Sequence, residues 1–214
     1  MNRLTSIIFD LDGTLYQSAE LAGEIQRVAA DGLALQLGIA AEEAATGLSA
    51  AKAELCAATG CEATLSAACE KLGGDIKALH RYLAEHISPE KYLVRDDRVV
   101  AMLERLGKEF GLYIYTNNNR SLTDRIMRAT GIDGLFSEVF SVEDFWRAKP
   151  DRLALAKLYA AIGAEPGECL FVGDRYDVDL KLPDEHGSRV FLTRTPDELL
   201  SLEKSCSKGE WTDD

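Results

Sequence analysis

The segment SIIFDLDGTL, residues 6–15, joins a short apolar run to two aspartates and a glycine. Its first part, Ser6 to Phe9, is rich in β-branched and aromatic residues and predicts a buried strand. Asp10 and Asp12 follow at once, and the two-residue period of a strand would send both side chains to the same side if the strand continued. Two carboxylates this close repel each other, so we expect a site that holds a cation or shares a proton. For Asp12 and Gly13 alone, a simple turn after the strand is an equally good interpretation.

Further apolar runs predict the rest of a sheet. They are Leu112 to Tyr115, Glu138 to Ser141, Leu170 to Val172 and Val190 to Thr193. Helical patterns lie between the later strands, at Asp97 to Lys108, Leu122 to Thr130 and Arg152 to Ile162. Strands that alternate with helices indicate a parallel sheet covered on both faces, in which ligands bind at the carboxyl ends of the strands. We therefore expect an α/β protein with a Rossmann-like, three-layer core.

Residues 16–94 have a different character, because they are rich in Ala, Leu and Glu and contain no convincing strand. Helices are predicted at Ala19 to Leu37, Ala41 to Cys56, Ala63 to Leu72 and Ile76 to His86. We expect a small all-helical unit inserted after the first strand. The predicted division is a core of residues 1–15 and 95–205, a helical unit of residues 16–94 and a loose C-terminal tail of residues 206–214.

Polar residues follow two of the later strands. Residues 116–119, Thr-Asn-Asn-Asn, offer hydroxyl and amide donors that can bind an oxyanion, although turn and capping roles are as common. Residues 173–179, GDRYDVD, contain three acids, which require either an exposed loop or a hard cation such as Mg²⁺. Between these segments, Lys149 precedes Pro150, and a lone lysine of this kind is most often a solvated surface charge.

Taken in order, these features resemble the four motifs of the haloacid dehalogenase-like (HAD) hydrolase superfamily. The motifs are the Asp-x-Asp-Gly-Thr of residues 10–14, Thr116, Lys149 before a proline, and Gly173-Asp174 with trailing acids. The helical insertion resembles the small C1-type cap of the phosphatase branch, which includes phosphoglycolate phosphatases, nucleotidases and β-phosphoglucomutase-like enzymes. The resemblance implies a phosphoric monoester hydrolase that depends on Mg²⁺.

The resemblance also implies a role for each motif residue. Asp10 would attack phosphorus and form an aspartyl-phosphate, while Asp12 would protonate the leaving group and later activate water. Mg²⁺ would be held by the carboxylates of Asp10 and Asp174 and by the backbone carbonyl of Asp12. Asp177 and Asp179 are both available to support the metal site, and Asp179 is favoured.

Donors for the phosphate are also implied. Thr116 and Lys149 would bind the phosphate oxygens, and Asn117 would add a donor from the same turn.

Alternative chemistries remain open on the same fold. A dehalogenase lacks the second aspartate, so Asp12 argues against it. A phosphonate hydrolase needs a cap lysine for a Schiff base, and Lys52, Lys71, Lys77 and Lys91 are candidates without supporting context. A phosphomutase acting on a sugar phosphate is the closest enzymatic alternative. A phosphoacceptor signalling domain and a non-catalytic binding member represent other classes.

Composition limits the partners. A net charge of -12 argues against nucleic acid and anionic membranes, so we expect a small phosphorylated metabolite as the partner. The five cysteines form no CxxC pair, and no targeting segment is evident, which favours a reducing, cytoplasmic location. The sequence gives no indication of oligomeric state. Polar cap residues that could contact the substrate are Arg27, Lys52, His80, Arg81 and His86, although an exposed helix face is the favoured interpretation for each.

Overall fold

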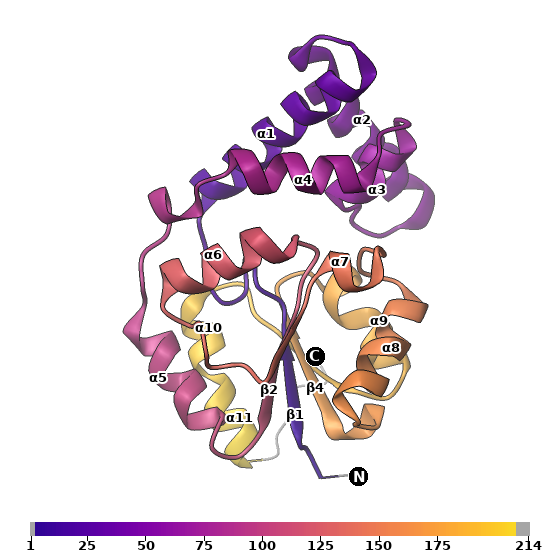
Figure 1. Ribbon diagram of the computed structural model, residues 1–214. Coiled ribbons are helices and arrows are strands. Elements are labelled where there is room, and N and C mark those ends of the chain that lie inside the picture. Colours follow the sequence, from indigo (N-terminus) through magenta and orange to yellow (C-terminus); the bar gives the residue numbers. More distant parts are fainter. Residues whose placement is uncertain (1–2, 209–214) are drawn as a thin grey trace.

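Five strands form a parallel sheet in the order β3-β2-β1-β4-β5 in the computed structural model, which describes residues 3–208 (Figure 1). Their bounds are Ser6–Phe9 (β1), Gly111–Tyr115 (β2), Glu138–Phe140 (β3), Cys169–Gly173 (β4) and Arg189–Leu192 (β5). Every strand expected from the sequence is present, with each end within one residue of its expected position. The α/β fold class is therefore confirmed.

The strand register brings the polar segments together. Phe9, at the end of the central strand β1, pairs with Ile114 of β2 on one side and with Val172 of β4 on the other. The residues that follow these three strands therefore lie along one edge of the sheet. This edge collects the acidic segment after β1, residues 116–119 and the acidic segment after β4.

Helices cover both faces of the sheet. The helices α5 (Asp97–Leu106), α6 (Arg120–Thr130), α10 (Pro196–Leu200) and α11 (Leu202–Lys208) contribute to the core on one face, while α7 (Val142–Phe145), α8 (Arg152–Ile162) and α9 (Lys181–Glu185) contribute to the core on the other. Along β1, Ile7 and Phe9 join the first core and Ile8 joins the second. Because both faces are buried, β1 is an uninterrupted apolar run in the sequence.

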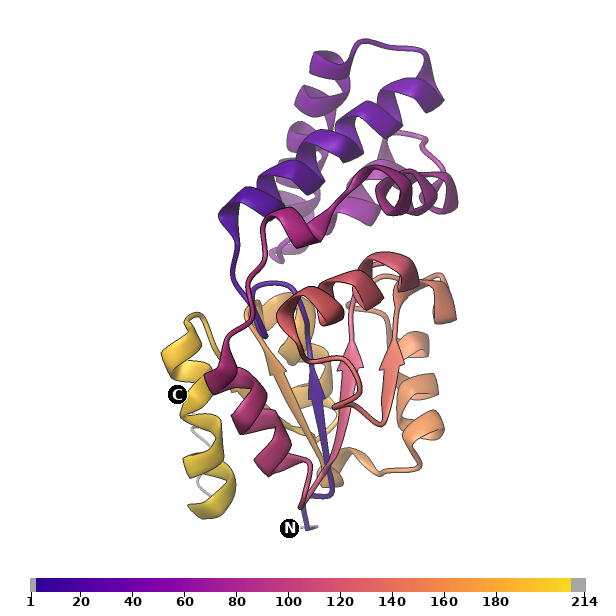
Figure 2. The ribbon, with the colours of Figure 1, turned by 60° about the vertical axis from the view of Figure 1, so that its left-hand side comes forward.

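The insertion after β1 is a helical cap. It consists of α1 (Ala19–Leu37), α2 (Ala41–Thr59), α3 (Leu65–Lys71) and α4 (Ile76–His86), followed by a 3₁₀ turn at Pro89–Lys91. The side chains of Ser18, Thr64 and Asp75 cap the N-termini of α1, α3 and α4. Figures 1 and 2 show the cap above the edge of the sheet at which β1, β2 and β4 end. The cap therefore faces the collected polar segments.

The last helix changes the expected C-terminal boundary. Helix α11 continues to Lys208, and Cys206 packs against the core. The loose tail expected from residue 206 therefore begins inside a helix, because Leu202 and Cys206, one turn apart, share an apolar contact with the core. The rest of that expected tail, residues 209–214, lies outside the described residues.

Two further expectations concern cysteines and membranes. All five cysteines are free thiols. Within residues 3–208, none of the helices combines the length and apolar character needed to cross a bilayer.

Candidate active site

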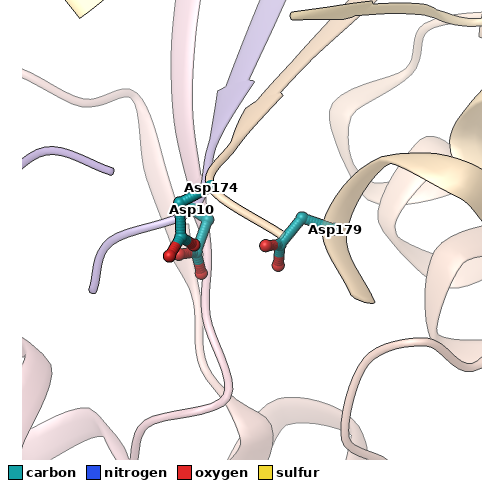
Figure 3. A group of neighbouring side chains, drawn as sticks. All are labelled: Asp10, Asp174 and Asp179. Atoms are coloured by element: carbon teal, nitrogen blue, oxygen red, sulfur yellow. The ribbon is translucent and has the colours of Figure 1, made fainter. Parts of the chain in front are cut away.

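Three acidic side chains meet at the edge of the sheet beneath the cap (Figure 3). Asp10 follows β1, Asp174 follows β4, and Asp179 lies in the π-helical turn Tyr176–Leu180. One carboxylate oxygen from each residue lies within 4.8 Å of the others, and Figure 3 shows Asp179 facing the other two from its turn. Carboxylates this close require positive charge to stay ionised together.

Lys149 supplies part of that charge. Its ammonium donates to Asp10 Oδ1 at 2.7 Å, to Asp179 Oδ1 at 2.7 Å and to the Tyr115 carbonyl at 2.8 Å. All three N–H donors of the lysine are thus engaged. Burial acts to lower the pKa of Lys149, but its ion pairs with the two aspartates outweigh that effect and raise the pKa above its ordinary value. The lysine expected to bind phosphate is therefore a buried counter-ion in this structure.

Asp12 has different surroundings from Asp10. Its Oδ1 accepts a hydrogen bond from the Tyr16 hydroxyl, and its Oδ2 accepts one from Asn118 Nδ2 at 2.6 Å. Burial, and next the negative charge of Asp10, raise the pKa of Asp12 to about 6. Asp12 can therefore exchange a proton near neutral pH, as a general acid and base must.

The side chains of residues 116–119 have different hydrogen-bond partners. Thr116 is a buried residue directly after β2. Its hydroxyl accepts a hydrogen bond from the backbone N–H of Asn118 at 3.1 Å. Asn117 accepts from the Lys149 amide at 2.7 Å and donates to the Lys149 carbonyl at 3.3 Å. Asn117 therefore fixes the backbone of Lys149, and one of the two N–H donors of its side chain is used for this. Asn118 bonds to Asp12, and the side-chain oxygen of Asn119 caps helix α6.

Two glycines allow the close approach of the acids. A Cβ on Gly13, whose φ is +85°, would lie 2.4 Å from Asp174 Oδ2. A Cβ on Gly173 would lie 2.5 Å from the Cβ of Asp179. Any larger residue at either position would push an acid out of the cluster.

Asp177 does not reach the cluster, although the sequence offered it as support for a metal site. It pairs with Lys181 at 3.5 Å across one turn. Asp177 and Asp179 are two positions apart in a helical turn, so their side chains point in different directions. The site is therefore built with Asp179 and without Asp177.

The cluster fits a hard divalent cation. Its donors are carboxylate oxygens, which Mg²⁺ prefers. Within the described residues, the buried Oδ1 of Asp174 accepts no hydrogen bond. Burial, and then the charges of Asp10 and Asp179, raise the pKa of Asp174 to about 7. A cation among these oxygens would complete the bonding of Asp174 and lower its pKa.

A cavity of about 690 Å³ separates the cap from this site. Asp12 and Asp174 line it from the core, whereas Lys52, Ser66 and His80 line it from the cap. A cavity of this size accommodates a small metabolite.

The polar cap candidates separate into two groups. Lys52 and His80 line the cavity. Arg27 forms ion pairs within α1 on an exposed face, and Arg81 and His86 are exposed. Only the first two can therefore contact a substrate in this arrangement.

The sheet, the helical cap and the acidic site define the class of protein. A family model described as haloacid dehalogenase-like hydrolase matches residues 4–182, so this chain belongs to the HAD-like hydrolases. The chain is accordingly an enzyme of that family, with a C1-type helical cap.

Individual relatives include phosphatases. Pyrophosphatase PpaX of Bacillus velezensis is 27% identical over 192 residues, which cover 81% of this chain and 76% of that protein. The crystal structure of a HAD phosphatase from Thermococcus onnurineus matches with a TM-score of 0.65 and 23% identity, over 98% of this chain and 100% of that one. A magnesium-bound structure of YfnB from Bacillus subtilis matches with a TM-score of 0.55 and 18% identity, over 95% of this chain and 100% of that one.

Three residues at the site were not selected from the sequence. Tyr16, which follows the first motif, donates to Asp12. Asn118, two residues after Thr116, could have been chosen over Asn117 from the two-residue period of an extended chain. Arg175 lies beside Asp174 and Asp179, and no motif in the sequence distinguishes it.

Proposed function

We propose that this protein is an Mg²⁺-dependent phosphatase that hydrolyses a small phosphorylated metabolite through an aspartyl-phosphate on Asp10. The observation that carries the proposal is the contrast between Asp10 and Asp12. Asp10 is paired with the Lys149 ammonium, whereas Asp12 is held by two neutral donors and has a pKa near 6. Two neighbouring carboxylates with different surroundings suit a nucleophile and an acid–base group.

In the first step, a carboxylate oxygen of Asp10 forms a bond to phosphorus as the bond from phosphorus to the leaving oxygen breaks. Asp12, protonated at the start, gives its proton to that leaving oxygen. Tyr16 and Asn118 hold the Asp12 carboxyl in place for this transfer.

In the second step, Asp12 takes a proton from water, and the water oxygen bonds to phosphorus. The bond between phosphorus and Asp10 breaks, which releases inorganic phosphate and restores both aspartates. Dividing one displacement into two in this way lowers the barrier of each.

Positive charge and hydrogen-bond donors would balance the phosphate. Asp10, Asp174 and the backbone carbonyl of Asp12 would hold Mg²⁺, with Asp179 supporting the site through Lys149. The ion would supply charge that offsets the repulsion between the nucleophile and the phosphate. Thr116 and Lys149 would donate to phosphate oxygens once the lysine shares its donors with the substrate.

The proposed substrate follows from the cavity and the family. A space of about 690 Å³ suits a small phosphorylated metabolite and excludes a nucleic-acid duplex or a membrane surface from the site. The B. velezensis relative is named a pyrophosphatase, so inorganic pyrophosphate belongs among the substrates to be tested. The cytoplasm is the proposed location.

The test measures phosphate release from p-nitrophenyl phosphate, a set of metabolite phosphates and pyrophosphate, with Mg²⁺ and with EDTA. Asp10→Asn keeps the size of the side chain but removes the nucleophile, so we expect kcat to fall by roughly 10³-fold or more. Asp177→Asn is the matched control, because it makes the same change outside the acidic cluster.

The outcomes separate the alternatives. Mg²⁺-dependent release that is lost in Asp10→Asn and kept in Asp177→Asn supports the phosphatase. Phosphorylation of Asp10 without phosphate release would instead favour transfer to a sugar, as in a phosphomutase. No release and no phosphorylation by folded, Mg²⁺-supplied protein would contradict the proposal.

A further inference from the structure

Three cationic residues line the cavity above the acidic site, and two of them, Lys52 and Arg175, are partly buried, whereas Arg194 is exposed. Lys52 comes from α2 of the cap, and Arg175 follows Asp174 at the end of β4 in the core. The proposed roles of Asp10, Asp12 and Asp174 do not require either of them.

Lys52 lacks an acidic partner. Its ammonium donates to Gln26 Oε1 at 3.0 Å, and no carboxylate in residues 3–208 forms an ion pair with it. The side chain is partly buried, and burial, followed by the positive charge of Arg175, lowers its pKa. A desolvated ammonium whose charged neighbour is another cation is unfavourable, so an anionic group bound in the cavity would stabilise it.

Arg175 also has donors to spare. Its Nε lies 3.8 Å from Asp174 Oδ1 and 4.0 Å from Asp179 Oδ2, beyond hydrogen-bond distance. Within the described part of the chain, its guanidinium donates no hydrogen bond to another side chain. An arginine presents five donors suited to carboxylate or phosphate, so the unused ones are available to a ligand in the cavity.

The direction of the proposed reaction determines which part of a substrate would meet these cations. In phosphoryl transfer the nucleophile and the leaving group are roughly in line. Asp10 lies at the edge of the sheet, so the leaving group points away from the sheet and into the cavity beneath the cap. Lys52 lies on that side.

We propose that Lys52 and Arg175 bind a second anionic group, a carboxylate or a phosphate, carried by the leaving group of the substrate. This inference rests on the proposed phosphatase function and narrows its substrate class to phosphate esters or anhydrides whose leaving group is itself anionic.

Besides the aspartates of the acidic site, one further acidic residue opposes the two cations. Glu62, an exposed residue of the cap, lines the same cavity and lies close enough to Arg175 to interact with its charge. Because it is exposed, solvent screens it more than it screens Lys52. Removing its charge by Glu62→Gln should increase the preference for an anionic leaving group, the opposite of the effect of removing Lys52.

The experiment compares 3-phosphoglycerate with glycerol 3-phosphate, which have the same carbon number and differ in one carboxylate. Pyrophosphate serves as the arm with a phosphate leaving group. The measured quantity is the ratio of kcat/KM for each anionic substrate to that for glycerol 3-phosphate. We expect the wild type to prefer 3-phosphoglycerate, pyrophosphate or both.

In Lys52→Met the ratio should fall by roughly 10-fold to 100-fold, the range for a hydrogen bond between charged groups, mainly through KM. Lys52→Arg should retain most of the preference, because it keeps the charge. Lys71→Met is the control, because Lys71 is a cap lysine that pairs with Glu54 and does not line the cavity. Thermal unfolding of each variant checks that the cap remains folded.

Three results would overturn the inference. In the first, the wild type hydrolyses p-nitrophenyl phosphate but has no preference for anionic leaving groups, which rejects the inference and leaves the phosphatase proposal intact. In the second, Lys52→Met lowers kcat/KM for 3-phosphoglycerate and for glycerol 3-phosphate equally. In the third, borohydride in the presence of phosphonoacetaldehyde modifies Lys52, which indicates a Schiff base. Release from no ester would reject the phosphatase proposal and this inference together.

Discussion

Tyr16 bonds to Asp12, the residue proposed to act as acid and base, and opposes the rise in its pKa. Its hydroxyl donates to the Asp12 carboxyl, and this bond acts to lower the pKa that burial raises. Tyr16→Phe removes a donor that stabilises the charged form, so the pKa of Asp12 should rise further. The limb of the kcat/KM profile that belongs to Asp12 should then move to higher pH. The control is Tyr176→Phe, whose hydroxyl bonds to Asp184 away from the site; equal profiles for wild type and Tyr16→Phe would contradict this role.

We expect His80 to make the free energy of unfolding sensitive to acid. Its Nε2 lies 3.1 Å from the Ser66 hydroxyl, and burial lowers its pKa from 6.5 to about 4. The unfolded chain therefore binds this proton at a higher pH than the folded chain does. The contribution of the neutral His80 to the free energy of unfolding is fully present above about pH 6.5. It is lost as the pH falls toward 4, which lowers the free energy of unfolding by on the order of 3 kcal/mol.

The measurement is the free energy of unfolding between pH 4 and pH 7. His80→Gln should flatten its decline toward acid, whereas His86→Gln changes an exposed histidine and should leave the decline unaltered. If His80→Gln and wild type lose stability in parallel, the buried histidine is not the cause.

Among single residues, the sequence identified the acidic residues of the site but not all of their hydrogen-bond partners. Asp10, Asp12 and Asp174 follow buried strands, and strand order alone brings them to one edge. Tyr16 and Asn118 lie in turns after strands, where the direction of a side chain depends on turn geometry that the sequence pattern does not specify.

The turn after β4 shows how an element positions a residue. It is a π-helix of five residues, and it returns Asp179 to the end of its own strand, against Gly173. In Gly173→Ala, the new methyl group would overlap the Asp179 side chain and separate it from Lys149. We expect a loss of roughly 1–3 kcal/mol in the free energy of unfolding, together with lower phosphatase activity.

Gly23→Ala is the matched control for that substitution. Gly23 lies inside α1 with no atom near the position of a Cβ. Alanine should therefore stabilise the protein there by about 0.5–1 kcal/mol. Urea unfolding of both variants provides the comparison, and a Gly173→Ala protein as stable as wild type would exclude the proposed contact.

The bounds of the long helices could be predicted from the sequence, whereas the shortest helices could not. Helices α1, α4 and α8 have the expected bounds, because an apolar period and a terminal glycine or an N-terminal cap mark each of them. Helices α7 and α9 have 4 and 5 residues, too few to show a helical period.

At the scale of the whole molecule, helix α6 of the core connects to the cap. Asn119 donates to the His80 carbonyl at 3.1 Å, and Arg125 donates to the Ile87 carbonyl at 2.6 Å. Arg125 also pairs with Glu90 at 2.8 Å. These bonds hold the C-terminal end of α4 against the core, next to the cavity.

Arg125→Met should loosen that connection. It removes the donor to Ile87 and the ion pair to Glu90 while keeping an apolar side chain of similar length. We expect faster hydrogen exchange at the C-terminal end of α4, with α8 of the core unaffected. Arg128→Met changes an arginine of the same helix that bonds to neither residue, and the same exchange pattern in both variants would contradict the connection.

The arrangement of cap and core was predictable in outline, because an insertion after the first strand must emerge above the carboxyl edge of a parallel sheet. The contacts between them were not. No motif in the sequence distinguishes Arg125, and an exposed helix face is the favoured interpretation of Lys52 there. Only the packing of α6 and α2 gives the two residues their neighbours.

The most direct test of the central claim is to identify the residue that carries phosphate during turnover. The protein would be mixed with its best substrate and Mg²⁺ and quenched in acid. Reduction with borohydride would then convert an aspartyl-phosphate to homoserine, which mass spectrometry locates. We predict homoserine at position 10 in wild type and in Asp177→Asn, and none in Asp10→Asn or without Mg²⁺. Homoserine at another position, or continued turnover with residue 10 unmodified, would contradict the account.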